Sequence, residues 1–296
     1  MRRFPPRFAM RTAGVAWCAL GRLASAQLPG VAVDPHLVVL THAKPSGEIT
    51  VVNPRSYATD FSVDLHFGYA TTDSAGQARV AITDDADGAS AAGWVTPSPR
   101  RFRLAAGASQ TVRLLAHPPA DTRDGEYWAR LTVHARDAAA PSRVAEGVAD
   151  STPGAVDTGV NAAPRVALAL ETATVLPVFY RQGAMQTGIA IDSLDARAVS
   201  DSAIEVRAML HRTGNAAFVG LATITVRDAS DRIVAATTRQ LAVYRASAPW
   251  WRLPFPGTAR GVGYRVTVEL STRRHDIDPH LVVAAPTEER TVALVP

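Results

Sequence analysis

The side chains in this sequence that are best suited to chemistry are two histidines with carboxylates between them. His275, Asp276, Asp278 and His280 lie close together along the chain, and imidazole and carboxylate groups are common ligands of zinc and other transition metals. Neighbouring donors do not by themselves fix a coordination geometry, so we interpret this segment as a solvated loop without a metal.

A second group of carboxylates, Asp84, Asp85 and Asp87 before Gly88, is similar in composition to a calcium-binding loop. Such loops close with a Glu that binds the ion through both oxygens, and this stretch has none. The sequence also lacks a G-x-S-x-G nucleophile motif, a phosphate-binding glycine loop and a zinc-binding helix motif. We therefore expect no enzyme activity, no cofactor, no metal and no small-molecule substrate.

The first 26 residues have the pattern of a secretory signal peptide. They carry five arginines and no acidic residue, with an apolar run at residues 14–20 (GVAWCAL) before the small residues at 24–26 (ASA). The pattern predicts export with cleavage after Ala26. Cys18 is the only cysteine and would leave with the signal, so the mature chain should contain neither disulfides nor thiolate sites.

The formal net charge of +4 comes from this N-terminal segment. Residues 27–296 hold 26 basic and 27 acidic side chains, so we expect no basic surface for nucleic acid. No stretch approaches the about 20 apolar residues of a membrane-spanning helix, and we expect no membrane span. With 47% hydrophobic residues, the chain can bury a core.

The candidate ligand residues must be positioned by strands. Apolar residues recur with a period close to two from Val31 onward, which is typical of strands. Phe61, Val63, Leu65 and Phe67 alternate with polar residues, which is typical of a half-buried strand. Residues 135–164 interrupt the pattern. They are rich in Ala, Pro, Ser, Gly and Asp, and we interpret them as a long flexible loop.

The expected strands fall into two series on either side of this loop. Turn residues separate them at a spacing that predicts an all-β protein of two β-sandwiches. We place the domains at residues 27–176 and 177–296. The first series covers residues 36–40, 48–53, 61–67, 78–82, 101–104, 110–115 and 127–133, and the second covers 188–194, 203–210, 220–226, 233–243, 264–270 and 291–295.

One hexapeptide, DPHLVV, occurs twice, at residues 34–39 and 278–283. The copies fall at the start of the first domain and near the end of the second, where duplication of a whole domain would not place them. Their composition favours a strand at both positions.

Three further parts of the sequence together form a pattern along the chain. They are residues 50–53 (TVVN), residues 95–107 (VTPSPRRFRLAAG) continued by 110–114 (QTVRL), and residues 122–128 (TRDGEYW) paired with 178–181 (VFYR). Together they resemble the periplasmic pilus-chaperone family, the PapD-like proteins: an early strand ending in Asn, a "TPP…RL.PG" passage, a "DRE" turn and an "FYR" junction. The order and spacing agree over residues 31–183.

The resemblance implies two immunoglobulin-like sandwiches set as an L with a cleft, in a periplasmic protein that binds secreted or pilus-type subunits. Such chaperones lend the last strand of the first domain to a subunit's unfinished sandwich, which is β-augmentation. The matching strand carries Val166, Leu168 and Leu170 as client-binding donor side chains. On the pattern alone, these three residues could equally pack inside their own sandwich.

The resemblance also assigns Asp124 and Arg181 to an interdomain ion pair with a structural role. Members of the family that build pili hold the terminal carboxylate of the subunit with two cations in the cleft. Those positions fall near Leu37 and at Pro177 here, and neither side chain can form a charge-assisted hydrogen bond.

Other cations would have to substitute for the missing pair, and His36 and Arg165 are the candidates along the chain. Two functions follow from the sequence. The first is a periplasmic chaperone that binds subunits by strand addition, and the alternative is a structural or adhesive envelope module without chaperone turnover. They differ in whether the edge at residues 166–170 is free to exchange a strand.

Overall fold

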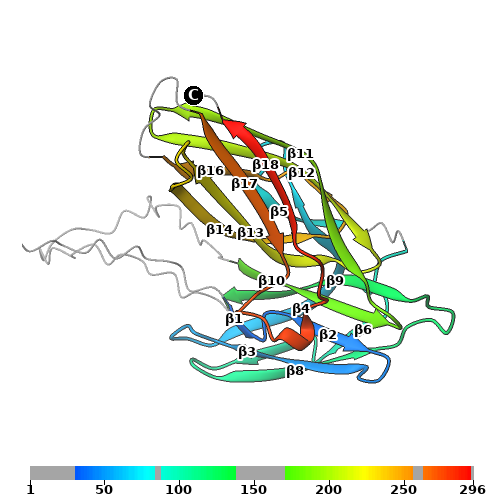
Figure 1. Cartoon of the computed structure of the whole chain (residues 1–296). Helices are drawn as coiled ribbons and strands as arrows, with labels where there is room; N and C mark the ends of the chain where they lie inside the picture. Colours follow the sequence, from blue (N-terminus) through cyan, green and yellow to red (C-terminus); the bar gives the residue numbers. More distant parts are fainter. Residues whose placement is uncertain (1–30, 84–87, 138–170, 256–262, 295–296) are drawn as a thin grey trace, which may run out of the picture.

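The computed structural model describes residues 31–83, 88–137, 171–255 and 263–294. Their regular secondary structure consists of strands and one short 3-10 helix, η1, so the predicted all-β class is confirmed. The strands pair into two β-sandwiches (Figure 1).

The first domain has two facing sheets. One has the order β1-β3-β8-β6, and the other has the order β2-β10-β9-β4-β5, with β7 also paired to β4. These orders correspond to the A-B-E-D and G-F-C sheets of an immunoglobulin-like sandwich, with β2 added beside β10, and β5 and β7 added beside β4. The strands are β1 (Ala32–Asp34), β2 (Val38–Thr41), β3 (Ser46–Val52), β4 (Thr59–Thr72), β5 (Ala78–Thr83), β6 (Val95–Ser98), β7 (Arg101–Leu104), β8 (Ser109–Ala116), β9 (Gly125–Asp137) and β10 (Glu171–Gln182).

The second domain repeats the two-sheet plan. One sheet contains β11-β12 with β15 and β16 on the far edge of β12, and the other has the order β14-β13-β17-β18. Its elements are β11 (Thr187–Ser200), β12 (Ala203–Gly214), β13 (Phe218–Arg227), β14 (Ile233–Val243), β15 (Ala246–Ser247), β16 (Trp250–Pro254), β17 (Tyr264–Ser271), η1 (Pro279–Leu281) and β18 (Glu288–Leu294).

Alternation of apolar residues builds each core. In β8, Val112 and Leu114 are fully buried while Arg113 and Leu115 face outward, so one face of the strand packs inward and the other meets solvent. Each sandwich encloses its own apolar cluster in this way.

The boundary between the domains lies later than the sequence suggested. β10 pairs with β9 up to Gln182, so the predicted break between residues 176 and 177 falls inside a strand of the first domain. The second domain begins with β11 at Thr187. The start of the predicted loop also shifts, because residues 135–137 belong to β9.

An aromatic cluster joins the two domains. Trp128 and Phe179 from the first domain pack against Tyr244 of the second, with edge-to-face ring centroids 5.0 and 5.9 Å away. All three side chains are almost completely buried. The area that they remove from water favours one fixed contact between the sandwiches.

A second contact is made by the β4–β5 hairpin, the cyan ribbon that rises beside the upper domain in Figure 1. The Trp250 amide donates to the carbonyl of Gly76 at 3.1 Å, and the Ala248 amide donates to Thr72 Oγ1 at 2.8 Å. Gly76 has a φ of +68°, and a Cβ there would lie 2.2 Å from Cγ of Trp250. Only glycine therefore fits this turn against the indole.

The two copies of the repeated hexapeptide have different structures. The first runs from the end of β1 into β2. The second forms η1, where Asp278 caps the turn by accepting a hydrogen bond from the His280 amide at 2.9 Å. The expected strand is thus formed only where β10 is available as a pairing partner.

Candidate functional site

The open edge of β10 is the first feature of the candidate site. β10 pairs with β9 along its whole length, but β2 pairs with its other edge only from Val178 to Arg181. Between Glu171 and Pro177, no described strand covers that edge. Its backbone N–H and C=O groups can therefore pair with an added strand.

The side chains of this open stretch alternate between two environments. Leu176 packs in the core of the first domain, whereas Val175 is 42% exposed, and Ala173 is also exposed. An edge that offers backbone groups together with alternating outward apolar side chains has what strand addition requires. The predicted donor residues Val166, Leu168 and Leu170 lie outside the described residues, directly before this stretch.

Glu126 is the polar centre of the junction between the domains. Its side chain is 1% exposed. Its carboxylate accepts hydrogen bonds from Arg181 Nε at 2.8 Å, from the Trp128 indole at 3.1 Å and from the Ala217 amide at 3.1 Å. Because Ala217 belongs to the second domain, this one carboxylate connects both sandwiches.

The acidic partner of Arg181 therefore differs from the sequence-based expectation. Asp124 does not pair with Arg181. Its carboxylate instead accepts a hydrogen bond from the Ala184 amide at 3.2 Å, in the connection to the second domain. The register explains the difference, because Arg181 lies directly opposite Glu126 on the neighbouring strand. Asp124 precedes the first residue of β9 and so lies outside this pairing.

Arg130 is a cation on the strand beside Pro177, the position at which the resemblance expects a lysine. The two residues face each other across β9 and β10. Arg130 is 5% exposed, and its Nε has no hydrogen-bond partner among the described residues. Its guanidinium carbon lies 5.0 Å from the centroid of the Tyr244 ring. Sequence reasoning missed this residue.

Tyr244 itself is perturbed by this environment. Burial raises the pKa of its phenol to about 12, and the positive charge of Arg130 opposes part of that rise. The Tyr244 carbonyl accepts a hydrogen bond from Arg212 Nε at 2.6 Å. Burial lowers the pKa of Arg212, although Glu126 acts in the opposite direction.

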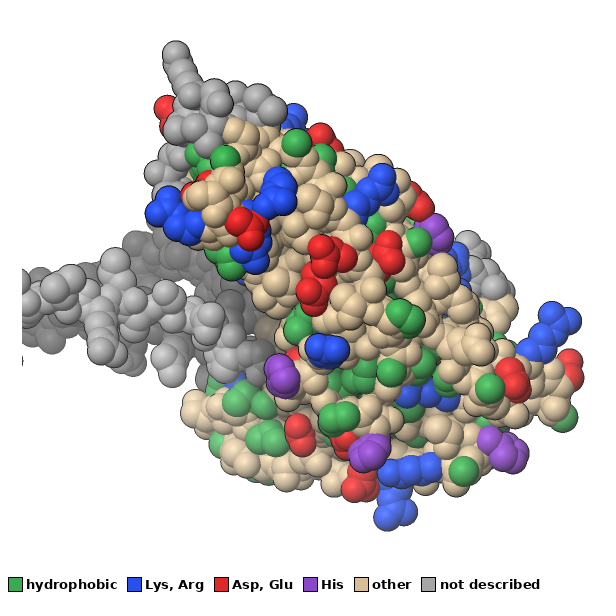
Figure 2. Space-filling model, viewed as in Figure 1, with side chains coloured by type: hydrophobic (Ala, Val, Ile, Leu, Met, Phe, Trp, Pro, Cys, Tyr) green, Lys and Arg blue, Asp and Glu red, His purple; other side chains and the backbone are tan. Residues whose placement is uncertain are grey.

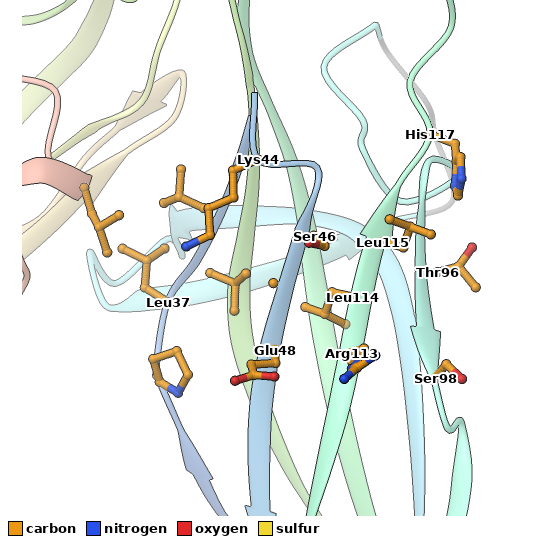
Figure 3. Close-up of a pocket in the computed structure, with 15 residues that line it drawn as sticks. Leu37, Lys44, Ser46, Glu48, Thr96, Ser98, Arg113, Leu114, Leu115 and His117 are labelled. Atoms are coloured by element: carbon orange, nitrogen blue, oxygen red, sulfur yellow. The ribbon is translucent and has the colours of Figure 1, made fainter. Parts of the chain in front are cut away.

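A separate groove of about 980 Å³ crosses the outer face of the β3–β8–β6 sheet beside β2 (Figure 3). It brings together Leu37 and Leu281, the corresponding leucines of the two hexapeptide copies. Figure 2 shows hydrophobic side chains in the middle of the view, at the level where Figure 1 draws η1 beside the first domain. The polar side chains of the groove are those of Lys44, Ser46, Glu48, Thr96, Ser98, Arg113 and His117.

The polar groups of this groove do not form a catalytic arrangement. Glu48 lies opposite Arg113 in the strand register, but no hydrogen bond joins any two of the groove's side chains in the part of the chain that the structure describes. Figure 3 shows Lys44 and His117 at opposite ends of the groove. We therefore treat it as an open surface and not as an active site.

The two aspartates among the candidate ligands at residues 275–280 have local partners. Asp276 accepts hydrogen bonds from Arg274 and from Gln240, and the bond from Arg274 is the main cause of its lowered pKa. Asp278 caps η1. Within the described ranges, no three His, Cys, Asp or Glu side chains are grouped as a metal site would require. Asp84, Asp85 and Asp87 lie outside those ranges.

No helix in the described part of the chain has the length and hydropathy to cross a bilayer.

Comparisons with known proteins give likenesses in structure only. No family model matches the sequence, and no curated protein matches it. Among solved structures, the YadV chaperone is 12% identical, with 90% of this chain and 100% of that chain covered and a TM-score of 0.41.

The E. coli chaperone DraB is 11% identical over 89% of this chain and 96% of that chain, with a TM-score of 0.39. The CsuC–CsuE chaperone–tip adhesion subunit complex of archaic Csu pili from Acinetobacter baumannii is 10% identical, with 90% of this chain and 99% of that chain covered and a TM-score of 0.42. All TM-scores here are below 0.5. The functional proposal therefore rests on β10 and the domain junction.

Proposed function

We propose that this chain is a periplasmic chaperone-like protein that binds segments of secreted or pilus-type subunits by strand addition at β10. The observation that carries the proposal is the unpaired edge from Glu171 to Pro177, with Val175 outward. An added strand would satisfy the backbone groups of this edge, and the outward apolar side chains would enter the partner's groove.

The donor strand of this proposal continues backward from β10 through Val166, Leu168 and Leu170. Export through the N-terminal signal, with cleavage after Ala26, would deliver the protein to the compartment where such subunits are exposed. The Glu126–Arg181 ion pair lies within the first domain and takes the place of the expected pair of Arg181 with Asp124. The same Glu126 carboxylate makes the connection to the second domain through the Ala217 amide. Binding by strand addition needs no cofactor, metal or nucleotide.

The test is capture of partners from a periplasmic extract by wild type and by Val175→Asp. The charge should abolish capture, because an aspartate in an apolar groove loses its hydration. Val199→Asp is the matched control, since Val199 is 37% exposed on β11 of the second domain and should leave capture unchanged. The double variant Leu168→Asp/Leu170→Asp tests the donor segment before β10.

Strand addition makes a second, independent prediction for a captured partner. Amide hydrogen exchange should slow in the complex at those residues of 171–176 whose N–H groups point away from β9, because the added strand protects them. Equal capture by wild type and Val175→Asp, with no change in exchange at these amides, would rule out strand addition at β10. That outcome would favour the structural or adhesive module.

A further inference from the structure

β5 is an edge strand with one open side (Figure 1). It pairs with β4 along residues 78–83, and no other described strand pairs with it. The hairpin begins with a hydrogen bond from the Asp73 amide to the Gln77 carbonyl, and hydrogen-bonded pairs alternate with non-hydrogen-bonded pairs from there. This alternation turns the backbone N–H and C=O groups of Val80 and Ile82 away from β4, towards the open side.

The side chains of Val80 and Ile82 add apolar surface to this edge. Each of them is 47% exposed. The residues opposite them on β4 are Ala70 and Gly68, which are too small to cover a valine or an isoleucine. The edge therefore combines outward backbone groups with exposed aliphatic side chains, and strand pairing between chains uses both.

Two other edge strands of the molecule are protected in ways that β5 is not. β6 contains Pro97, which has no N–H group to donate to an added strand. At the edge of β11, the Arg290 side chain donates to the carbonyl groups of Ile191 and Asp192 and occupies acceptors that an added strand would use. β5 contains no proline, and its register with β4 has no bulge.

The charges on the hairpin do not oppose pairing with an identical strand. Arg79 is the one charged residue of β5, and its Nε lies 2.7 Å from Oδ2 of Asp73 in the same hairpin. Two copies of a chain carry the same charges, so an edge with a net charge would repel its own copy. This edge is neutral as a whole and meets the self-complementarity that a symmetric dimer requires.

The second domain holds the tip of the hairpin in place. The Gly76 carbonyl accepts a hydrogen bond from the Trp250 amide at 3.1 Å, and Thr72 Oγ1 accepts one from the Ala248 amide at 2.8 Å. A strand that is ordered before it binds loses less conformational entropy on pairing. The edge of β5 is therefore prepared for an incoming strand.

We infer that β5 pairs with β5 of a second copy of this chain, antiparallel and about a two-fold axis. With Ala81 on the axis, Val80 of each copy lies opposite Ile82 of the other. Both residues direct their backbone groups to the open side, so this register lets them exchange hydrogen bonds. It also forms two aliphatic cross-strand pairs on one face of the joined sheet, and such pairs stabilise strand pairing.

This dimer leaves the open edge of β10 accessible. β5 lies at one end of the sheet β2-β10-β9-β4-β5, with β4 and β9 between it and β10. The inference therefore does not depend on strand addition at β10. If both hold, one dimer presents two β10 edges to its partners.

The test measures the oligomeric state of the chain from Gln27 onward by sedimentation velocity. Loading concentrations from about 1 to 200 μM suit the weak association that a small contact area allows. The weight-average sedimentation coefficient of wild type should rise with concentration. For Ile82→Lys the dissociation constant should increase at least about tenfold, because a lysine on an edge strand blocks pairing.

The matched control is Ile233→Lys. Ile233 is 52% exposed and lies on β14, an edge strand of the second domain, so the same substitution is made at a similar exposure on another edge. Its association should equal that of wild type. Circular dichroism should show the same strand content in all three proteins, because both isoleucines are exposed.

Amide hydrogen exchange of wild type gives a second readout that needs no variant. At high protein concentration the amides of Val80 and Ile82 should exchange more slowly, because their N–H groups face the second copy. The amide of Ala81 points towards β4 and should change less. Exchange at Val80 and Ile82 that does not depend on concentration would contradict the pairing.

Two outcomes of sedimentation would overturn the inference. If wild type remains a monomer up to the highest concentration, β5 does not bind a second copy, and its edge is left for a strand of another protein. If Ile82→Lys associates as wild type does, or if Ile233→Lys alone loses association, the contact between copies lies elsewhere on the molecule.

Discussion

Replacement of Glu126 by alanine tests whether one buried carboxylate holds the two domains together. The substitution removes the shared acceptor of Arg181, the Trp128 indole and the Ala217 amide, at 2.8, 3.1 and 3.1 Å. Breaking a buried ion pair from one side costs about 3–5 kcal/mol. Each neutral donor left without an acceptor adds about 1–3 kcal/mol if it stays buried.

These contributions do not simply add, because the Arg181 side chain is 12% exposed and can gain some water when its partner is lost. We therefore expect Glu126→Ala to lower the free energy of unfolding by about 4 kcal/mol. Glu126→Gln retains one acceptor oxygen and should cost about 1.5–3 kcal/mol, the contribution of a hydrogen bond to a charged group. Urea denaturation followed by tryptophan fluorescence measures both, since Trp128 lies at the junction.

The control is Asp60→Asn on the surface of the first domain. Asp60 lies 3.8 Å from Arg103, and both side chains are more than half exposed, so its loss should change stability by less than about 0.5 kcal/mol. A loss below about 1 kcal/mol in Glu126→Ala would refute the reasoning. The aromatic cluster and the β4–β5 hairpin would then be sufficient to hold the domains together.

Two further predictions concern the same interface. Gly76→Ala should lower the free energy of unfolding by about 3 kcal/mol, because of its left-handed backbone and the displacement of Trp250. The control Gly107→Ala has a φ of +70° but no atom within 4 Å of an added Cβ, so it should lower this free energy by only about 1 kcal/mol. Equal decreases in urea denaturation would contradict the packing of Gly76 on Trp250. Burial raises the folded-state pKa of Tyr244 from 10.0 to about 12, so the neutral phenol stabilises the fold fully below pH 10, and this contribution is lost as the pH rises towards 12. Phenolate absorbance, compared with that of Tyr244→Phe, measures the ionisation. If Tyr244 ionises at pH 10 in the folded protein, the ring is not buried.

The alternation of apolar and polar residues predicted the strands whose two faces differ most in burial. β8 and β13 have a strictly alternating pattern of burial, and the sequence shows it directly. The distal part of β4, residues 68–72, was not predicted, because Gly, Tyr, Ala and Thr there do not alternate. It is a strand because β5 pairs with it, and that partner is a property of the folded hairpin.

The site was less predictable, because it depends on register and on the second domain. Arg181 was recognised as the junction cation, but its partner depends on which residue of β9 lies opposite, and Glu126 does. Arg130 alternates with the buried Ala129 and Leu131, so the sequence describes it as an outward, solvated arginine. In the structure its guanidinium lies over the ring of Tyr244, more than a hundred residues later in the chain.

The two contacts between the domains have a consequence for how a partner is recognised. Glu126 connects the sandwiches at one place, and the β4–β5 hairpin holds Trp250 at another. Two domains that touch at one place can rotate about that contact, whereas contacts at two separate places prevent this rotation. Most two-domain proteins bend at their linker, but here both halves should tumble in solution with one rotational correlation time. If β10 accepts a strand as proposed, the surface around it therefore has a fixed curvature, and the incoming chain is the component that must adapt its shape.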